Sequence, residues 1–284
     1  MTVDEPIADL DPFARRLRML RSRGRLSETF ADVEADVRAA LGHGEFLLLY
    51  QPRFSLRTQD VVAIEALLRW RDPTLGMLSP PAFLPRIAHT SVMAPLGRWV
   101  LHQACLEAAH WEAQRPAGET PIVVSVNVAA REIIEPSFVG TVLEIIDEMR
   151  LAPHLLQLEV DAADSLRGES SVASRLDLLR DRGVRVAIDG ASPALGLGGG
   201  RLDVDSVHLH RQWVRGVGID PSLTDSIAAL VERVHRAGGE VCAMGVEDQR
   251  QADALAAMGC DQAQGFLLCD PLLPDALGWL GAPD

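Results

Sequence analysis

The sequence predicts an α/β protein with a modified (β/α)8 TIM-like barrel, whose first strand runs antiparallel to the others. About eight strand-like apolar runs alternate with helical patterns from Phe46 onward, as in a barrel of this class. Most runs are continuous stretches of Val, Ile and Leu, which is typical of strands covered on both faces. The segment FSLRTQD is too short for a helical crossover, so the first two strands should form an antiparallel hairpin.

The strands and helices can be placed in order along the chain. The expected strands are Phe46–Gln51, Val61–Trp70, Ile122–Asn127, Leu155–Asp161, Val184–Asp189, Ser206–Leu209, Glu240–Ala243 and Gln262–Phe266. The expected helices, which place apolar residues at helical spacing, are Pro95–Gln114, Phe138–Met149, Ser165–Asp181, Ser222–Ala237 and Gln249–Met258. The pair Asp220-Pro221 opens the fourth helix, because an aspartate cap followed by proline is a common helix start.

The first 30 residues differ in composition from the rest of the chain. We assign residues 1–30 to an N-terminal helical extension or linker, and residues 31–284 to the barrel domain. Within the extension, arginines alternate with Leu and Met over Phe13–Arg25. Two interpretations remain open: a basic amphipathic helix that contacts a partner or an anionic membrane surface, and a solvated helix or linker.

Charge and hydropathy exclude several functional classes. The chain of 284 residues has a formal net charge of −13 and a pI near 5.0, so we expect no binding to a nucleic-acid polymer. No apolar run reaches the roughly 18 residues of a membrane span, and no signal peptide is visible, so we expect a cytoplasmic protein.

The four cysteines lack CxxC spacing and should stay reduced. All 27 basic residues are Arg, which excludes any mechanism that needs a lysine amine.

Polar side chains stand at the ends of the expected strands, where a barrel of this class carries its chemistry. They are Glu65, Asn127, Glu159, Asp189, Glu247 and Gln264. Any one of the acidic residues alone would fit a helix cap. Several carboxylates and amides that converge on one barrel mouth instead form an oxygen-rich site, which suits Mg²⁺, Mn²⁺ or Ca²⁺. We expect one divalent cation and no organic cofactor.

An ordered series of segments resembles a known bacterial family. ALGHGEFLLLYQP, IEALLRWRDPTLGMLSPPAFLP, VSVNV, LQLEV, GVRVAID, GVEDQRQADAL and GCDQAQGF follow one another from about Val37 to Leu280. Glu65, Ala66 and Leu67 form the triplet after which this family is named. The series resembles the EAL family, the cyclic di-GMP phosphodiesterase-type domain. The resemblance implies a (β/α)8 barrel with an antiparallel first strand, in agreement with the expected hairpin.

The resemblance also implies an activity and a site. In active members two divalent metals bridge a phosphate of cyclic di-GMP and activate the water that opens the ring to linear pGpG. Carried over, the first metal site would be Glu65, Asn127, Glu159 and Asp189. The implied ligand-binding residues are Gln51, Glu65, Leu67, Arg69, Asn127, Asp189, Glu247 and Gln264.

The chain departs from the family pattern where the second metal and the catalytic lysine belong. Gly190 replaces the second Asp of an Asp-Asp-Phe-Gly loop, and His208 replaces the lysine. Met244 replaces an acidic residue of the family, and Ala162 replaces the Glu that ties down the loop. The loop itself reads GASPALGLGGG, so we expect residues 190–200 to be poorly ordered or unusually packed; in the family this loop helps to form a dimer.

These losses predict a degenerate member that binds without useful hydrolysis. The first hypothesis is a cyclic di-GMP receptor, and the second is a protein-interaction module that needs no nucleotide. A third is a weak phosphodiesterase that uses one metal and His208, which lies one strand period from His210 and should point to the same side. A protein partner is expected, and a homodimer remains open.

Overall fold

The computed structural model describes residues 30–162, 170–194 and 204–281. The expected helix at Phe13–Arg25 and most of the glycine-rich loop lie outside these ranges. The chain divides into two compact units: Leu68–Leu96 with the residues up to Leu47 form the first, and Leu48–Leu67 with the residues from Gly97 onward form the second. Strands β1 and β2 contribute residues to both units. The expected division at residue 30 stays a prediction.

The smaller unit is organised around aromatic side chains. It contains α2 (Phe30–His43), β3 (Gly76–Leu78), the 3-10 turn η2 (Pro80–Ala82) and α3 (Leu84–Ile87). The rings of Phe46, Trp70 and Phe83 lie with centroids 5.5–5.9 Å apart, and the indole of Trp70 donates to Glu45 at 3.0 Å. Strand β3 pairs antiparallel with the end of β2. Neither α2 nor β3 was predicted, because one is highly charged and the other has only three residues.

The larger unit is a closed barrel, as predicted. Its strands are β1 (Phe46–Ser55), β2 (Val61–Asp72), β4 (Val123–Asn127), β5 (Leu156–Asp161), β6 (Arg185–Ala191), β7 (Ser206–Leu209), β8 (Glu240–Met244) and β9 (Gln262–Gln264). The described strands from β2 through β9, apart from β3, pair in parallel in chain order, and β1 closes the ring between β9 and β2. Strand β1 runs antiparallel to β9, which confirms the expected antiparallel first strand.

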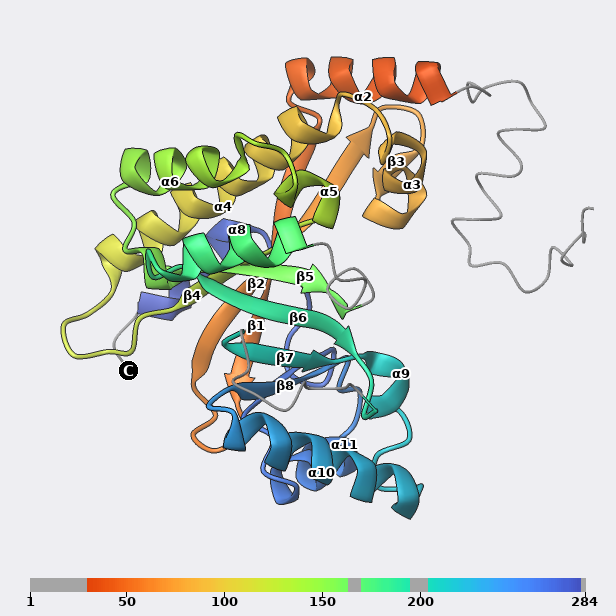
Figure 1. Ribbon diagram of the computed structural model, residues 1–284, viewed down its shortest axis with the longest axis vertical. Helices are drawn as coiled ribbons and strands as arrows, with labels where there is room; N and C mark the ends of the chain where they lie inside the picture. The colour runs from red at the N-terminus through yellow and green to blue at the C-terminus, as the bar shows by residue number, and fades with distance from the viewer. Residues whose placement is uncertain (1–29, 163–169, 195–203, 282–284) are drawn as a thin grey trace, which may run out of the picture. The chain divides into compact units, whose positions relative to one another are not determined.

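Helices follow the parallel strands, as Figure 1 shows for α8, α10 and α11. They are α4 (Met93–Gln114), α5 (Ala130–Ile133), α6 (Phe138–Met149), α8 (Ser170–Arg180), α9 (Arg211–Val214), α10 (Pro221–Arg236) and α11 (Gln249–Ala257), with 3-10 turns η3 (Pro153–Leu155) and η4 (Pro274–Gly281). Asp220 caps α10 by accepting from the N–H groups of Ser222 and Leu223, as the Asp-Pro pair predicted. In the described part of the chain, we find no helix with the length and apolar character that a membrane crossing requires.

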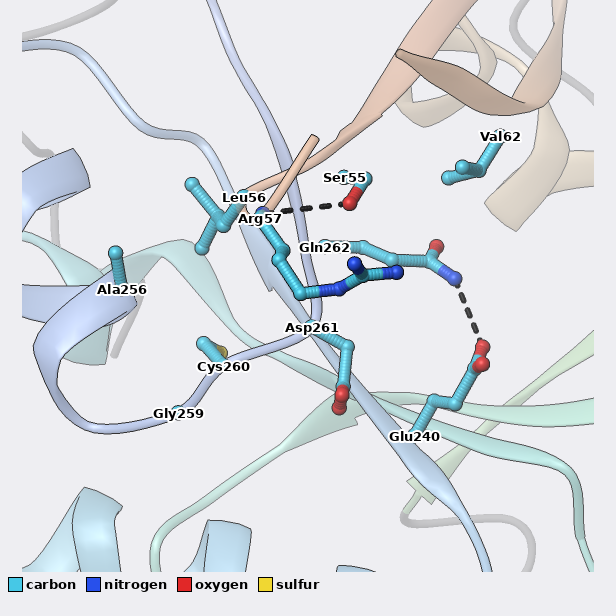
Figure 2. Close-up of a pocket in the computed structure, with 10 residues that line it drawn as sticks. All are labelled: Ser55, Leu56, Arg57, Val62, Glu240, Ala256, Gly259, Cys260, Asp261 and Gln262. Atoms are coloured by element: carbon cyan, nitrogen blue, oxygen red, sulfur yellow. Dashed lines mark hydrogen bonds between the residues drawn. The ribbon is translucent and has the colours of Figure 1, made fainter. Parts of the chain in front are cut away.

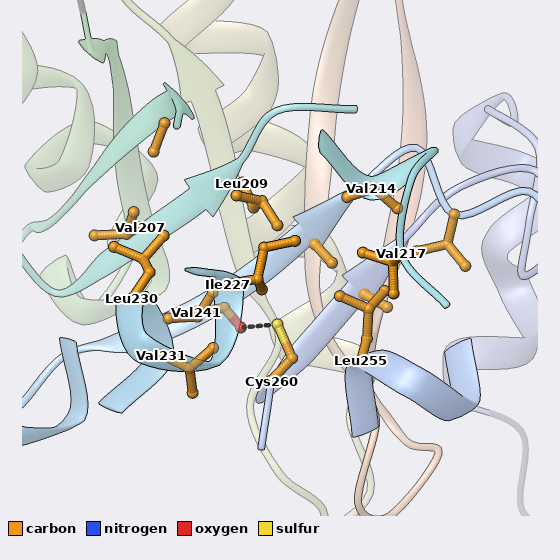
Figure 3. Close-up of a cluster of buried hydrophobic side chains, with 14 of the residues drawn as sticks. Val207, Leu209, Val214, Val217, Ile227, Leu230, Val231, Val241, Leu255 and Cys260 are labelled. Carbon is orange, nitrogen blue, oxygen red and sulfur yellow. Dashed lines mark hydrogen bonds between the residues drawn. The ribbon is translucent and has the colours of Figure 1, made fainter. Parts of the chain in front are cut away.

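An apolar core fixes the outer face of the barrel under α10 and α11. Leu209 and Val241 point outward from β7 and β8, and Ile227 and Leu255 from the two helices meet them (Figure 3). All four side chains are fully buried. Burial of each is worth about 1.5–3 kcal/mol, so this cluster holds the strand ends that carry the polar groups.

Gly265 directly follows β9 and packs against the backbone of Val246. A β-carbon at Gly265 would lie 2.1 Å from the carbonyl oxygen and 2.2 Å from the nitrogen of Val246. We therefore expect Gly265→Ala to cost about 3 kcal/mol or more in chemical denaturation, because backbone atoms must move. In the matched control Gly140→Ala, on an open face of α6, the new methyl group meets nothing within 4 Å. That variant should gain up to about 1 kcal/mol through helix propensity, and equal stabilities of the two variants would contradict the packing.

Candidate functional site

The interior of this barrel is polar rather than apolar. TIM barrels usually fill this space with layers of branched aliphatic side chains. Here the buried polar and charged residues of the barrel strands are Gln51, Arg53, Glu65, Ser125, Gln157, Glu159, Ser206, His208 and Gln264. Period-two alternation puts them inside, because their strand neighbours form the apolar core outside. Polar groups at this depth need partners, so the network among them defines the site.

Arg53 of β1 lies at the centre of this network and has no exposed surface. Its guanidinium donates to a carboxylate oxygen of Glu159 on β5 and, at 2.8 Å, to the amide oxygen of Gln264 on β9. A third guanidinium nitrogen lies 3.3 Å from Nε2 of His208 on β7. One cation thus joins the antiparallel strand to three parallel strands. The sequence analysis did not single out Arg53, although it stands two residues after Gln51 and so shares its face.

A second group of contacts gathers four of the predicted ligand-binding residues. The amides of Asn127 and Gln264 each donate to one oxygen of the Glu65 carboxylate, both at 2.7 Å. Gln264 also donates to the amide oxygen of Gln51 at 2.9 Å, and Gln51 donates to the carbonyl of Cys269. Residues from β1, β2, β4 and β9 therefore meet at one place; Asn127 and Gln264 end their strands, whereas Gln51 and Glu65 lie within longer strands.

Two predicted metal ligands lie beside His208. Its Nδ1 is 3.5 Å from Oε2 of Glu159 and 3.9 Å from Oδ1 of Asp189. One ligand atom from each of the three residues lies within 4.8 Å of the others, so this group could surround one metal ion. Oε2 of Glu159 and Nδ1 of His208 are buried, and apart from this contact with each other they have no hydrogen-bond partner among the described residues.

Burial and mutual repulsion change the acidity of these carboxylates. Burial, together with the charge of Glu159, raises the pKa of Glu65 to about 7. Burial alone would raise the pKa of Glu159, but the Arg53 guanidinium and His208 outweigh it and hold that pKa well below its ordinary value. Burial and the Glu159 charge raise the pKa of Asp189. Of the three, Glu159 is therefore the carboxylate most firmly held as an anion.

The structure gives Gly190 a backbone that a side chain would strain. Gly190 has φ of +75°, in the left-handed region that favours glycine. A β-carbon there would meet Oδ2 of Asp161 at 3.7 Å, an ordinary contact, so space is available. Ala162, the predicted replacement of a loop-fixing Glu, is buried directly after β5. Residues 195–203 of the loop lie outside the described chain.

Other predicted residues have different partners. Glu247 is exposed and lies 3.8 Å from the guanidinium of Arg215. Arg69 belongs to the smaller unit, where it donates to the carbonyl of Leu68 at 2.8 Å. Met244 is half-buried at the end of β8, with its sulfur 3.7 Å from that of Cys242, and Leu67 is half-buried. The roles that the resemblance implies for these residues stay predictions.

His208 and His210 were expected to point to the same side, but they serve different purposes. Strand β7 ends at Leu209, so His210 has already left the strand. Its Nδ1 accepts from the N–H of Gln212 at 3.2 Å and caps α9. His208 alone reaches the buried network.

A separate pocket of about 450 Å³ opens where the parallel strands begin. Figure 2 shows the side chains of Glu240 and Gln262 joined by a hydrogen bond, which measures 2.9 Å, with Arg57 reaching across the opening. Glu240 and Gln262 are the first residues of β8 and β9. This end of a (β/α)8 barrel usually contributes stability, so we place the chemistry at the other end.

Comparison with known proteins agrees with this geometry. The family model described as "EAL domain" matches residues 34–271. The chain belongs to the EAL domain family. It is 35% identical over 244 residues to Rv1357c of Mycobacterium tuberculosis, an uncharacterized protein, covering 82% of this chain and 78% of that protein. EAL domains are in general metal-dependent, and the Glu159, Asp189 and His208 group is a candidate for such an ion.

Two further likenesses concern cyclic di-GMP. The cyclic di-GMP phosphodiesterase PA2567 of Pseudomonas aeruginosa is 31% identical over 249 residues, which cover 85% of this chain and 41% of that protein. The chain therefore spans about two fifths of the length of that relative. The structure of the PaMucR phosphodiesterase in complex with c-di-GMP matches with a TM-score of 0.78 and 27% identity, covering 87% of this chain and 99% of that chain.

Replacing the Arg53 guanidinium by a neutral side chain should reveal the free-energy cost of burying the Glu159 carboxylate without a partner. We expect Arg53→Met to lose about 3–5 kcal/mol of unfolding free energy, because Glu159 would remain buried without its partner. Glu159→Gln in the same background should recover at least half of that loss. Arg57→Met, in the exposed hairpin turn, is the matched control and should stay within about 0.5 kcal/mol of the unmodified protein. If the losses of unfolding free energy in the Arg53 and Glu159 double-mutant cycle were strictly additive, they would contradict a direct interaction between the two side chains.

Glu65 should make stability fall as pH rises. Its pKa in the fold, about 7, lies above the ordinary 4.5, so ionisation costs nothing below about pH 4.5 and its full cost is present above about pH 7. That cost is on the order of 3 kcal/mol. In EDTA, Glu65→Gln should therefore gain stability relative to the unmodified protein between pH 5 and pH 8. Glu135→Gln, on an exposed position, is the control; a pH-independent difference for Glu65→Gln would contradict the shifted pKa.

Proposed function

We propose that this EAL domain is a receptor for cyclic di-GMP that binds the nucleotide with a divalent cation and does not usefully hydrolyse it. The observation that carries the proposal is that one set of predicted residues is present and the other is not. Gln51, Glu65, Asn127 and Gln264 are joined by hydrogen bonds, whereas Gly190 offers no carboxylate for a second ion. The named cyclic di-GMP phosphodiesterase among the relatives supports the choice of ligand.

The charge balance of the site explains why a cation should accompany the nucleotide. Glu65, Glu159 and Asp189 face a single buried guanidinium, that of Arg53. A ligand with two phosphates would meet a net negative interior and be repelled. A bound divalent ion would supply positive charge to both the carboxylates and a phosphate oxygen. Ligand and ion should therefore strengthen one another's binding.

The same residues explain why turnover should be low. Hydrolysis by two metals uses one ion on each side of the displacement. Gly190 supplies no ligand for the second ion, and the chain contains no lysine to replace the one the family uses. His208 is buried between Arg53, Gln157 and Ser206, so its Nε2 faces protein rather than a substrate. Loss of one oriented electrostatic contact costs about 10²–10³ in rate, and here several are lost together.

Calorimetry and product analysis test the proposal together. We expect heat on addition of cyclic di-GMP, an affinity that falls at least about tenfold in EDTA, and no accumulation of pGpG over hours. Asn127→Ala should weaken binding, because Asn127 is exposed at the strand end and holds Glu65 in place. Gln59→Ala, in the hairpin turn at the other end of the barrel, is the matched control and should bind normally.

Two results would overturn the proposal. Absence of binding heat at high protein concentration would favour a protein-interaction module that needs no nucleotide. Robust pGpG formation by the unmodified protein would make it a phosphodiesterase, and Glu65→Ala would then test the metal ligands.

Restoration of the missing groups should require several changes. Gly190→Asp alone is expected to leave the protein inactive and to lose about 1 kcal/mol, because the left-handed backbone at φ +75° disfavours a side chain. The combined variant Gly190→Asp, His208→Lys, Met244→Glu should form a trace of pGpG above the unmodified protein. Full activity of Gly190→Asp by itself would show that His208 and Met244 do not limit turnover.

A further inference from the structure

The pocket where the parallel strands begin lies at the end of the barrel opposite to the proposed nucleotide site. Its volume of about 450 Å³ is within the range of roughly 300–1,000 Å³ that small-molecule sites occupy. Its walls come from the turn between β1 and β2, the first residues of β8 and β9, and the end of α11 with the loop that follows it. The proposed receptor function makes no use of this pocket.

The pocket is the outer end of the polar interior. Ser55 stands two residues beyond Arg53 on β1, and Gln262 stands two residues before Gln264 on β9, so each pair shares one face of its strand. Ser55 and Gln262 both line the pocket. The polar lining therefore continues from the buried network to this opening, which is the kind of surface that holds a polar ligand.

Three charged side chains line the pocket without neutralising one another. Arg57 reaches across the opening (Figure 2), and its guanidinium makes no hydrogen bond or ion pair with a described residue. One oxygen of the Glu240 carboxylate accepts from Gln262 at 2.9 Å, and the other has no hydrogen-bond partner in the described part of the chain. Oδ2 of Asp261 accepts from a backbone N–H at 2.7 Å and lies 2.8 Å from Nε2 of His235, which leaves Oδ1 for another group.

The two carboxylates of the pocket disfavour each other's charge. Partial burial of its carboxyl group, together with the charge of Asp261, raises the pKa of Glu240. Arg57 pairs with neither carboxylate, so the arrangement adds little to the stability of the fold. A ligand that brings positive charge to the two carboxylates would relieve their repulsion.

The charges of the pocket select a ligand with the complementary set. A basic α-amino acid carries two cationic groups and one carboxylate, which match two carboxylates and one guanidinium. We propose that this pocket binds a basic α-amino acid of the arginine type, with its carboxylate on Arg57 and its cationic groups on Glu240 and Asp261. The methylene groups of the ligand lie against Leu56 and Ala256. The protein's net charge of −13 attracts such a cation, and binding needs no nucleotide, so it does not depend on the proposed receptor function.

Calorimetry of the full chain without nucleotide tests the ligand class with three probes. L-arginine should bind once per chain. L-citrulline, which has nearly the same shape but no side-chain charge, and agmatine, which lacks the carboxylate, should each bind at least about tenfold more weakly, because each loses a charge-assisted contact. No binding of L-arginine at millimolar concentrations, or equal affinities for the three probes, would overturn the proposal.

Variants at the two ends of the pocket locate the bound ligand. Arg57→Met should weaken L-arginine binding at least about tenfold and leave agmatine binding unchanged, because agmatine has no carboxylate for Arg57. Glu240→Gln should weaken the binding of both probes. Arg98→Met and Glu144→Gln, which break an exposed ion pair between α4 and α6, are the matched controls and should bind L-arginine normally. An unchanged L-arginine affinity in Arg57→Met, or an equal loss for agmatine, would contradict the assigned contact.

Methyl resonances of the unmodified protein provide a readout that needs no variant. L-arginine should shift the methyl signals of Leu56 and Val62, which line the pocket, and leave those of Leu178, which is exposed on α8, in place. Unshifted signals of Leu56 and Val62 at saturating L-arginine would overturn the proposal, whether or not the protein binds cyclic di-GMP.

Discussion

The buried ion pair between Arg53 and Glu159 is the constraint on which the interior of this barrel depends. A guanidinium without exposed surface must find its acceptors inside the protein, and Glu159, Gln264 and the imidazole of His208 each contact one of its three nitrogens. These partners come from β5, β9 and β7, while Arg53 comes from the antiparallel β1. The apolar layers that fill most TIM barrels are therefore replaced by one connected set of polar groups. Each member is costly to remove alone, because its partner would remain buried and unpaired.

The pair also divides the site into two parts. On one side, Gln264 connects Arg53 to Glu65, Gln51 and Asn127, where both oxygens of the Glu65 carboxylate are occupied. On the other side, Arg53 takes one oxygen of Glu159 and leaves the second toward His208 and Asp189. In the first part, the polar side chains are held in place by hydrogen bonds to one another. The second holds the contact between His208 and Glu159, with the Asp189 carboxylate 3.9 Å from the same imidazole nitrogen.

The departures from the EAL pattern follow the same geometry. Gly190 removes a carboxylate at the rim and adopts a backbone conformation that disfavours its return. His208 places an imidazole in the interior, where an amine would bring three donors and no acceptor. An imidazole can instead accept from Arg53 at Nε2 and donate from Nδ1 to the Glu159 carboxylate. In the proposed receptor, these two positions would therefore lack groups that a two-metal hydrolysis uses, while the remaining carboxylates could still hold a cation.

The architecture could be read from local patterns, because each barrel strand is an unbroken apolar run and the short first connection permits only an antiparallel hairpin. Glu65, Asn127, Glu159 and Asp189 could be placed together for a similar reason, since parallel strands end at one mouth. The role of Arg53 could not, because its partners lie 106 to 211 residues away and depend on the register of four strands. Their spacing of two residues predicted that His208 and His210 would point to the same side of one strand. The end of β7 between them made one a buried member of the polar network and the other a helix cap, a difference that exists only once the strands are paired.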